Sequence, residues 1–141
     1  ERRGAVKTTD ELRNAIRSSS DPAMLAGGAF TPPDFTFYLC NLLERRGCLV
    51  KDAIRACYLE QSYGYQLFNG TRPPTRTFLL RLALALDLGE EETQKLLTRC
   101  GRASLYPRSR FDAAVLYGLT HHLTLEETDE LLLSLGEGGL L

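Results

Sequence analysis

Apolar residues recur every three or four positions along most of this chain, and this spacing limits the fold more than any other feature. In the stretch that ends at Gly47, the residues on one helical face are Phe35, Tyr38, Leu39, Leu42 and Leu43. No segment alternates apolar and polar residues with the β-branched enrichment that is typical of strands. The sequence therefore predicts an all-α fold.

Caps and turn residues divide the periodic stretches into separate helices. Thr9 and Asp10 can cap the first helix, and Gly47 can end the second. The segment between these two helices is rich in Ser, Gly and Pro, as expected for a connector. The predicted helices cover residues 9–17, 34–46, 50–57, 61–69, 75–86, 90–100, 108–121 and 125–135.

The last four predicted helices contain an internal resemblance. Leu88–Gly101 and Leu123–Gly136 match at seven positions without a gap, at an offset of 35 residues. Two tandem helical hairpins explain the match, and a chance likeness between two leucine-rich amphipathic helices also explains it. A repeat array needs about three units to be stable. We therefore expect these helices to form an extension that closes the core.

Charge is distributed unevenly along a chain whose net charge is only −1. Residues 44–81 carry seven cations and three acids, a net charge of +4, whereas residues 107–141 carry two cations and six acids, a net charge of −4. Nucleic-acid-binding domains are usually basic, so the total charge argues against one. The basic middle segment argues for one.

Several classes of site and location are not indicated. No apolar run reaches the roughly 18 residues of a membrane span, and the N-terminus lacks the apolar core of a signal peptide. The four cysteines have neither C-x-x-C spacing nor a histidine at ligand spacing, so we expect free and mostly buried thiols in a reducing compartment. We interpret His121–His122 as a contact at a helix end rather than a metal pair. A cytoplasmic bacterial protein without metal or cofactor is expected.

Two short predicted helices joined by a tight turn, over residues 50–57 and 61–69, form a helix-turn-helix pattern. From the end of the second helix the sequence reads Asn69-Gly70-Thr71-Arg72-Pro73-Pro74-Thr75, with Leu79, Leu82-Ala83 and Ala85-Leu86 further on. These residues match without a gap the pattern of the lambda-repressor-like, or Xre-type, helix-turn-helix family, which this stretch resembles. The resemblance covers roughly residues 34–88, and the whole chain looks like bacterial members with added C-terminal helices. It implies three parts: an N-terminal helix and connector over 1–33, the helix-turn-helix domain over 34–88, and a C-terminal helical extension over 89–141 packed on the same core.

The resemblance implies that the helix over 61–69 enters the major groove of double-stranded DNA as part of a transcriptional regulator. With Gly64 and Leu67 facing the core, Ser62 and Gln66 point outward, and Gln66 can bond an adenine bidentately. The expected base contacts are Gln61, Ser62, Tyr63, Tyr65 and Gln66. The expected contacts to the DNA backbone are Lys51, Asn69, Thr71, Arg72 and Arg76.

Four residues depart from the family pattern. Gly64 stands where an aliphatic core residue is usual and Ile54 where a small one is usual, so we expect Ile54 to fill the space beside Gly64. Tyr58 replaces the usual turn glycine. Glu60 replaces the usual Ser or Thr cap, and glutamate is a poorer cap.

The sequence also bears on two functions other than DNA binding. The sequence has no Gly-rich phosphate loop, no nucleophile elbow and no catalytic cluster of His, Asp and Cys, so we expect no enzyme. A non-catalytic protein-interaction module stays open, because Tyr63 and Tyr65 could cover a partner and the acidic C-terminal helices could bind one. A homodimer is also expected, through the C-terminal hairpin or the N-terminal arm.

Overall fold

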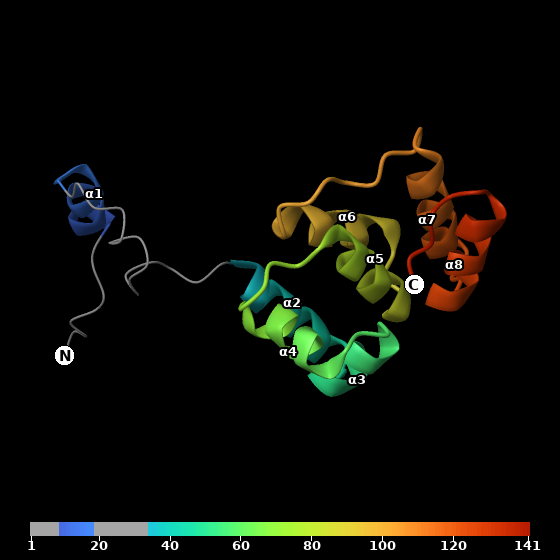
Figure 1. Ribbon diagram of the computed structural model, residues 1–141, viewed down its shortest axis with the longest axis horizontal. Coiled ribbons are helices and arrows are strands. Elements are labelled where there is room, and N and C mark those ends of the chain that lie inside the picture. Colours follow the sequence, from blue (N-terminus) through green and yellow to red (C-terminus); the bar gives the residue numbers. More distant parts are fainter. Residues whose placement is uncertain (1–8, 19–33) are drawn as a thin grey trace. The chain divides into compact units, whose positions relative to one another are not determined.

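The computed structural model describes residues 9–18 and 34–141, and every regular element in those ranges is an α-helix (Figure 1). This confirms the all-α class. The helices are α1 (Thr9–Ser18), α2 (Asp34–Arg45), α3 (Val50–Ala56), α4 (Gln61–Asn69), α5 (Arg76–Ala85), α6 (Glu90–Arg99), α7 (Arg110–Thr120) and α8 (Leu125–Ser134). The predicted connector between α1 and α2 lies outside the described residues. No described helix has the length and apolarity that crossing a membrane requires.

Residues 1–32 and 33–141 form two separate units, and each is described by itself. Within the first, α1 has acidic residues in its first turn, where Asp10 pairs with Arg13 at 3.2 Å, and an exposed Ile16. The second unit contains α2 to α8. One cluster of buried side chains runs from Leu39 to Leu140, so the helices before and after residue 88 share a core. The expected internal boundary at residue 88 stays a prediction.

The core of the larger unit is centred on α5, which packs against α3, α6, α7 and α8 (Figure 1). Its buried side chains point in nearly all directions and are Phe78, Leu79, Leu80, Leu82, Ala83 and Leu84. A helix that is apolar all round has to be covered on every side. The ring of Phe68 on α4 meets Phe78 edge to face, with centroids 5.5 Å apart, so α4 is fixed to this central helix.

Each of the seven helices of this unit is followed, one or two positions after its last residue, by a residue with positive φ. Glycine occupies four of these positions, and Tyr58, Asp87 and His122 occupy the other three, with φ of 57°, 54° and 57°. In six of the seven, the N–H of the next residue donates to a carbonyl in the last turn, for example Leu59 to Ile54 at 3.1 Å. After Gly70, the N–H of Thr71 donates to Asn69 Oδ1 instead. Non-glycine residues in this conformation cost roughly 1–2 kcal/mol each.

The two matching segments around α6 and α8 adopt the same local structure. Thr93 and Thr128 are both fully buried, and each donates its hydroxyl to the carbonyl of the residue before its helix, Gly89 or Thr124. This equivalence favours tandem hairpins over a chance likeness. The C-terminus then returns to the core, where Asp129 accepts from the last two backbone N–H groups and Leu140 is buried.

All four cysteines are free thiols. Burial raises the pKa of the Cys57 thiol to about 12 and that of Cys100 to about 11. Cys48 is half-buried, and Cys40 is exposed, with its Sγ 3.7 Å from the carbonyl oxygen of Phe68. The prediction of mostly buried thiols is therefore wrong for Cys40.

Candidate nucleic-acid interface

The short helices α3 and α4 are joined by residues 57–60 and lie in close contact. A Cβ built on Gly64 would lie 2.6 Å from Cγ2 and 2.7 Å from Cγ1 of Ile54. Ile54 is 3% exposed. The expectation that Ile54 fills the space beside Gly64 is confirmed. Tyr58, in the turn, has the left-handed conformation that the usual glycine would adopt.

The outer face of α4 carries the residues expected to contact bases. Gly64, Leu67 and Phe68 are buried beneath it. Gln61, Ser62 and Tyr65 are exposed, and Tyr63 and Gln66 are half-buried on the same helix. Tyr65 keeps 41% of its surface exposed. The structure therefore places the five predicted residues on one helix, with three of them exposed.

The start of α4 is capped more effectively than the sequence suggested. The Glu60 carboxylate accepts hydrogen bonds from the backbone N–H of Tyr63 at 2.8 Å and of Ser62 at 3.0 Å. These bonds hold the pKa of Glu60 below its ordinary value. The prediction of a poor cap is wrong here, since the longer side chain reaches two N–H groups. Both groups are thereby occupied by a carboxylate of this chain.

The end of α4 folds Arg72 back along the helix. Gly70 has φ of 85°, and Asn69 Oδ1 accepts from the N–H of Thr71 at 2.8 Å. The backbone N–H of Arg72 then donates to the carbonyl of Gln66 at 3.1 Å, and its Nε donates to Gln66 Oε1 at 2.7 Å. Its guanidinium carbon lies 5.7 Å from the centroid of the Tyr63 ring. An expected base contact and an expected phosphate contact are therefore bonded to each other.

Arg76 is a correction to the predicted DNA-backbone contacts. Nη1 and Nη2 of its guanidinium donate to both carboxylate oxygens of Asp112 at 3.0 Å. Nε and Nη2 also donate to the carbonyls of Ala103 and Ser104 at 3.0 Å. Asp112 follows 36 residues later in the chain, so local patterns give no sign of the pairing. The group holds α5, α7 and the loop before α7 together and is not available to a phosphate.

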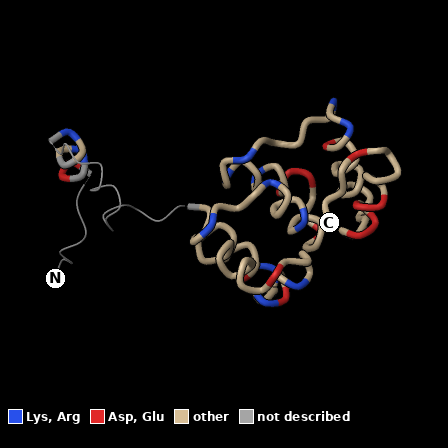
Figure 2. The backbone as a smooth tube through the Cα atoms, in the orientation of Figure 1, with Lys and Arg blue, Asp and Glu red and all other residues tan. Residues whose placement is uncertain are grey.

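A second cation of the basic segment is also neutralised within the fold. Arg46 donates to Glu92 at 2.8 Å and to the carbonyl of Leu86 at 2.9 Å. Glu92 and Asp112 lie outside residues 44–81, and including these two acids lowers the local net charge from +4 to +2. Both signs of charge occur along α3, and acidic residues mark α8 (Figure 2).

Two exposed cations stand on α3 beside the outer face of α4. Lys51 and Arg55 line a small hollow of about 270 Å³ between the two helices, together with Gln61 and Tyr65. Arg55 is not among the predicted DNA contacts, although it lies four residues after Lys51 on the same helical face.

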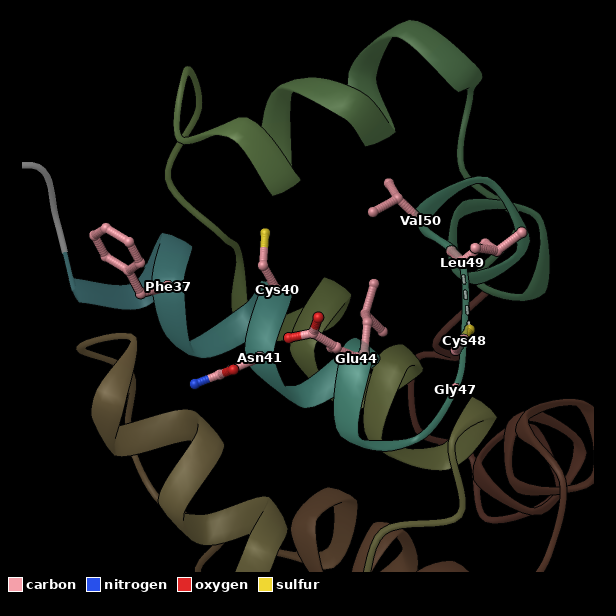
Figure 3. A pocket seen from close by; sticks show the side chains of 9 residues that line it. Phe37, Cys40, Asn41, Glu44, Gly47, Cys48, Leu49 and Val50 are labelled. Carbon is pink, nitrogen blue, oxygen red and sulfur yellow. Dashed lines mark hydrogen bonds between the residues drawn. The ribbon is translucent and has the colours of Figure 1, made fainter.

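A larger hollow on another face holds none of the predicted DNA contacts. It lies between α2 and the segment that leads into α3 and has a volume of about 610 Å³ (Figure 3). Its exposed apolar side chains are Phe37, at 69%, and Leu49, at 60%. Cys40, Cys48 and Glu44 are also in its wall.

A third hollow, of about 550 Å³, lies where α3, α5 and α7 end beside the start of α8. Its walls include Tyr58, Asp87 and His122, which are the three non-glycine residues with positive φ in the described ranges. The Tyr58 hydroxyl bonds to Glu126, which raises the pKa of Tyr58 and lowers that of Glu126. His122 Nδ1 lies 3.0 Å from Asp87 Oδ1. Within the described residues, no three His, Cys, Asp or Glu side chains are grouped to hold a metal.

The chain was compared with protein-family models, with curated proteins and with solved structures. None of the three comparisons finds a match.

Proposed function

We propose that this chain is a cytoplasmic, non-enzymatic transcriptional regulator that binds duplex DNA through a lambda-repressor-like helix-turn-helix. In this proposal α3 and α4 are the two helices of the motif, and α6 to α8 are added helices that complete the core. The observation that supports it best is the neutral, exposed row of Gln61, Ser62 and Tyr65, with exposed cations on both sides.

The chemistry of duplex DNA suits this arrangement. An α-helix fits the major groove, where amide and hydroxyl groups can bond base edges. Phosphate contacts from flanking cations position a protein without reading sequence. Lys51 and Arg55 stand on the α3 side of the row, and Arg72 follows the end of α4. A homodimer would place two such helices about one helical turn of DNA apart.

The salt dependence of binding tests this proposal. Each neutralised phosphate contributes about −0.9 to the slope of log K against log salt, so three cations predict a slope of about −2.7 for each protomer. Fluorescence anisotropy with a random duplex between about 50 and 200 mM NaCl measures that slope. Lys51→Ala should reduce its magnitude by about one unit. Lys95→Ala, a change to an exposed lysine on α6, is the matched control and should leave it unchanged.

A non-catalytic protein-interaction module is the second candidate. The reduction of the local charge to +2 and the Glu60 carboxylate at the start of α4 favour it, since both weaken attraction to phosphates. The same titration separates the two candidates. A chain that is folded by circular dichroism and binds no duplex at the lowest salt concentration would support the interaction module and contradict DNA binding.

A further inference from the structure

Arg72, Gln66 and Tyr63 form a connected group on the outer side of α4. The Nε of Arg72 donates to Gln66 Oε1 at 2.7 Å, and the guanidinium lies over the Tyr63 ring at 5.7 Å from its centroid. A backbone bond of 3.1 Å from Arg72 N–H to the Gln66 carbonyl fixes the same two residues a second time. The guanidinium therefore approaches Gln66 in a defined way.

The chemistry of arginine decides which way the Gln66 amide faces. A guanidinium only donates hydrogen bonds, so its partner in Gln66 has to be the carbonyl oxygen. The NH₂ group of the amide is then directed away from Arg72. Within the described part of the chain, no residue accepts a hydrogen bond from Nη1 or Nη2 of Arg72. The group consequently presents N–H donors from both residues.

We propose that this donor surface makes the protein select guanine, rather than adenine, at the base pair that Gln66 contacts. The inference rests on the proposed DNA binding and assigns its base preference. In the major groove guanine offers two acceptors, N7 and O6, whereas adenine offers one acceptor and one amino donor. A bidentate bond to adenine would need the second lone pair of Gln66 Oε1. That oxygen already accepts a charged hydrogen bond, and the cation beside it repels the amino hydrogens of adenine.

Arg72 is thus a positioning and specificity-determining residue in addition to a cation near the DNA backbone. Removing its side chain frees the Gln66 carbonyl and makes adenine acceptable. Arg72→Ala should therefore change which base is preferred, and a residue that only contacts a phosphate should not. Lys51→Ala serves as the matched variant, because Lys51 is an exposed cation that makes no hydrogen bond to a residue on the outer face of α4.

Selection from a pool of random duplexes tests the inference. The wild-type chain should enrich guanine at one position, and Gln66→Ala identifies that position by abolishing the preference there. A good bidentate contact discriminates by roughly 5- to 160-fold, so Arg72→Ala should lower the guanine-to-adenine ratio by about tenfold or more. Lys51→Ala should weaken binding to every duplex and leave the ratio unchanged. Gln66→Glu, which presents only acceptors, should favour cytosine in place of guanine.

The possible results separate the inference from the function on which it rests. Adenine at the Gln66 position in the wild type, or a guanine preference that Arg72→Ala leaves unchanged, would overturn the inference while DNA binding stands. A wild-type chain that prefers no base at the Gln66 position would also overturn the inference while DNA binding stands. Failure of the folded wild-type chain to bind any duplex at low salt would reject DNA binding and the guanine preference together.

Discussion

The α3–α4 and α7–α8 pairs are built alike, yet their polar side chains do different things. In each pair a glycine allows the two helices to approach closely: a Cβ on Gly64 would lie 2.6 Å from Ile54, and one on Gly118 would lie 2.5 Å from Thr128. Both pairs pack on the central helix, since α5 contacts α3, α7 and α8. Their backbones therefore follow the same principle of construction.

Three acids of the α7–α8 pair stabilise the fold. Asp112 pairs with Arg76, Glu127 completes the cap of α8, and Asp129 holds the C-terminal residues. On α4, by contrast, the side chains of Gln61, Ser62 and Tyr65 make no hydrogen bond with any described residue. The presence of these three acids in α7 and α8 is thus explained by their contribution to stability, whereas that of Gln61, Ser62 and Tyr65 on α4 is not. The side chains of α4 that form no hydrogen bond within the described part of the fold are therefore free to contact a ligand.

The largest effect should come from breaking the acid that joins the C-terminal pair to α5. Asp112 is 6% exposed and accepts from Arg76 and from the backbone N–H of Tyr106. Removing one partner of a buried pair costs roughly 3–5 kcal/mol, so Asp112→Ala should lower the free energy of unfolding by about 4 kcal/mol. Urea denaturation measures it. Glu130→Ala, at an exposed acid of α8, should change it by less than about 0.5 kcal/mol. Equal effects of the two variants would mean that Asp112 contributes no more to stability than an acid exposed to solvent.

The next effect concerns the contact that closes the α3–α4 pair. Ile54→Ala should cost about 3 kcal/mol, because it leaves a cavity beside Gly64. Gly64→Ala alone should cost about 1–3 kcal/mol, because its Cβ would clash with Ile54. In the double variant the new methyl enters the cavity, so the combined loss should be at least about 1 kcal/mol smaller than the sum. A double-mutant cycle in urea measures this coupling, and additive losses would contradict the close packing.

The parts of the fold that depend on local chemistry were predictable from the sequence. The ends of α4 follow from a cap residue and from Gly70, and its inward face follows from the spacing of Gly64 and Leu67. The exchange between Ile54 and Gly64 was predictable because two departures from one pattern compensated in volume. These signals all lie within about one helical turn or within one pair of adjacent helices.

The wrong assignment of Arg76 and the missed Arg72–Gln66 bond concern long side chains whose partners are set by tertiary structure. The error at Glu60 is local, because the reach of the glutamate side chain to two N–H groups was underestimated. The resemblance implies a phosphate contact for Arg76, whereas Asp112 reaches it only once α7 packs on α5. The Arg72–Gln66 bond spans six residues but requires the left-handed turn at Gly70. A flexible arginine can point in many directions, so sequence spacing alone does not select its partner.

A smaller effect is expected from the backbone of the turn between α3 and α4. Tyr58 has φ of 57°, a conformation that costs a residue with a Cβ roughly 1 kcal/mol relative to glycine. Tyr58→Gly should therefore be more stable than Tyr58→Ala by about 1 kcal/mol. Both variants lose the bond to Glu126, so their difference isolates the backbone conformation. Thermal denaturation of the two variants measures it, and equal melting temperatures would show that the turn is unstrained.

The smallest expected effect is a pH-dependent change in stability, which distinguishes the Glu60 cap of α4 from the Thr124 cap of α8. The two N–H bonds to the Glu60 carboxylate lower its pKa, so its stabilisation is present above the ordinary carboxyl pKa of about 4.3. That stabilisation is lost as the pH falls through the lowered pKa of the folded state. Glu60→Gln should therefore be slightly less stable than the wild type at neutral pH and should equal it in acid. Thr124, which caps α8 with a hydroxyl, is the control: Thr124→Ala should cost about 1 kcal/mol at neutral and at acid pH alike. Urea titrations at the two pH values decide the matter, because a Glu60→Gln difference that persists in acid would mean that hydrogen-bond geometry, and not charge, makes Glu60 an effective cap.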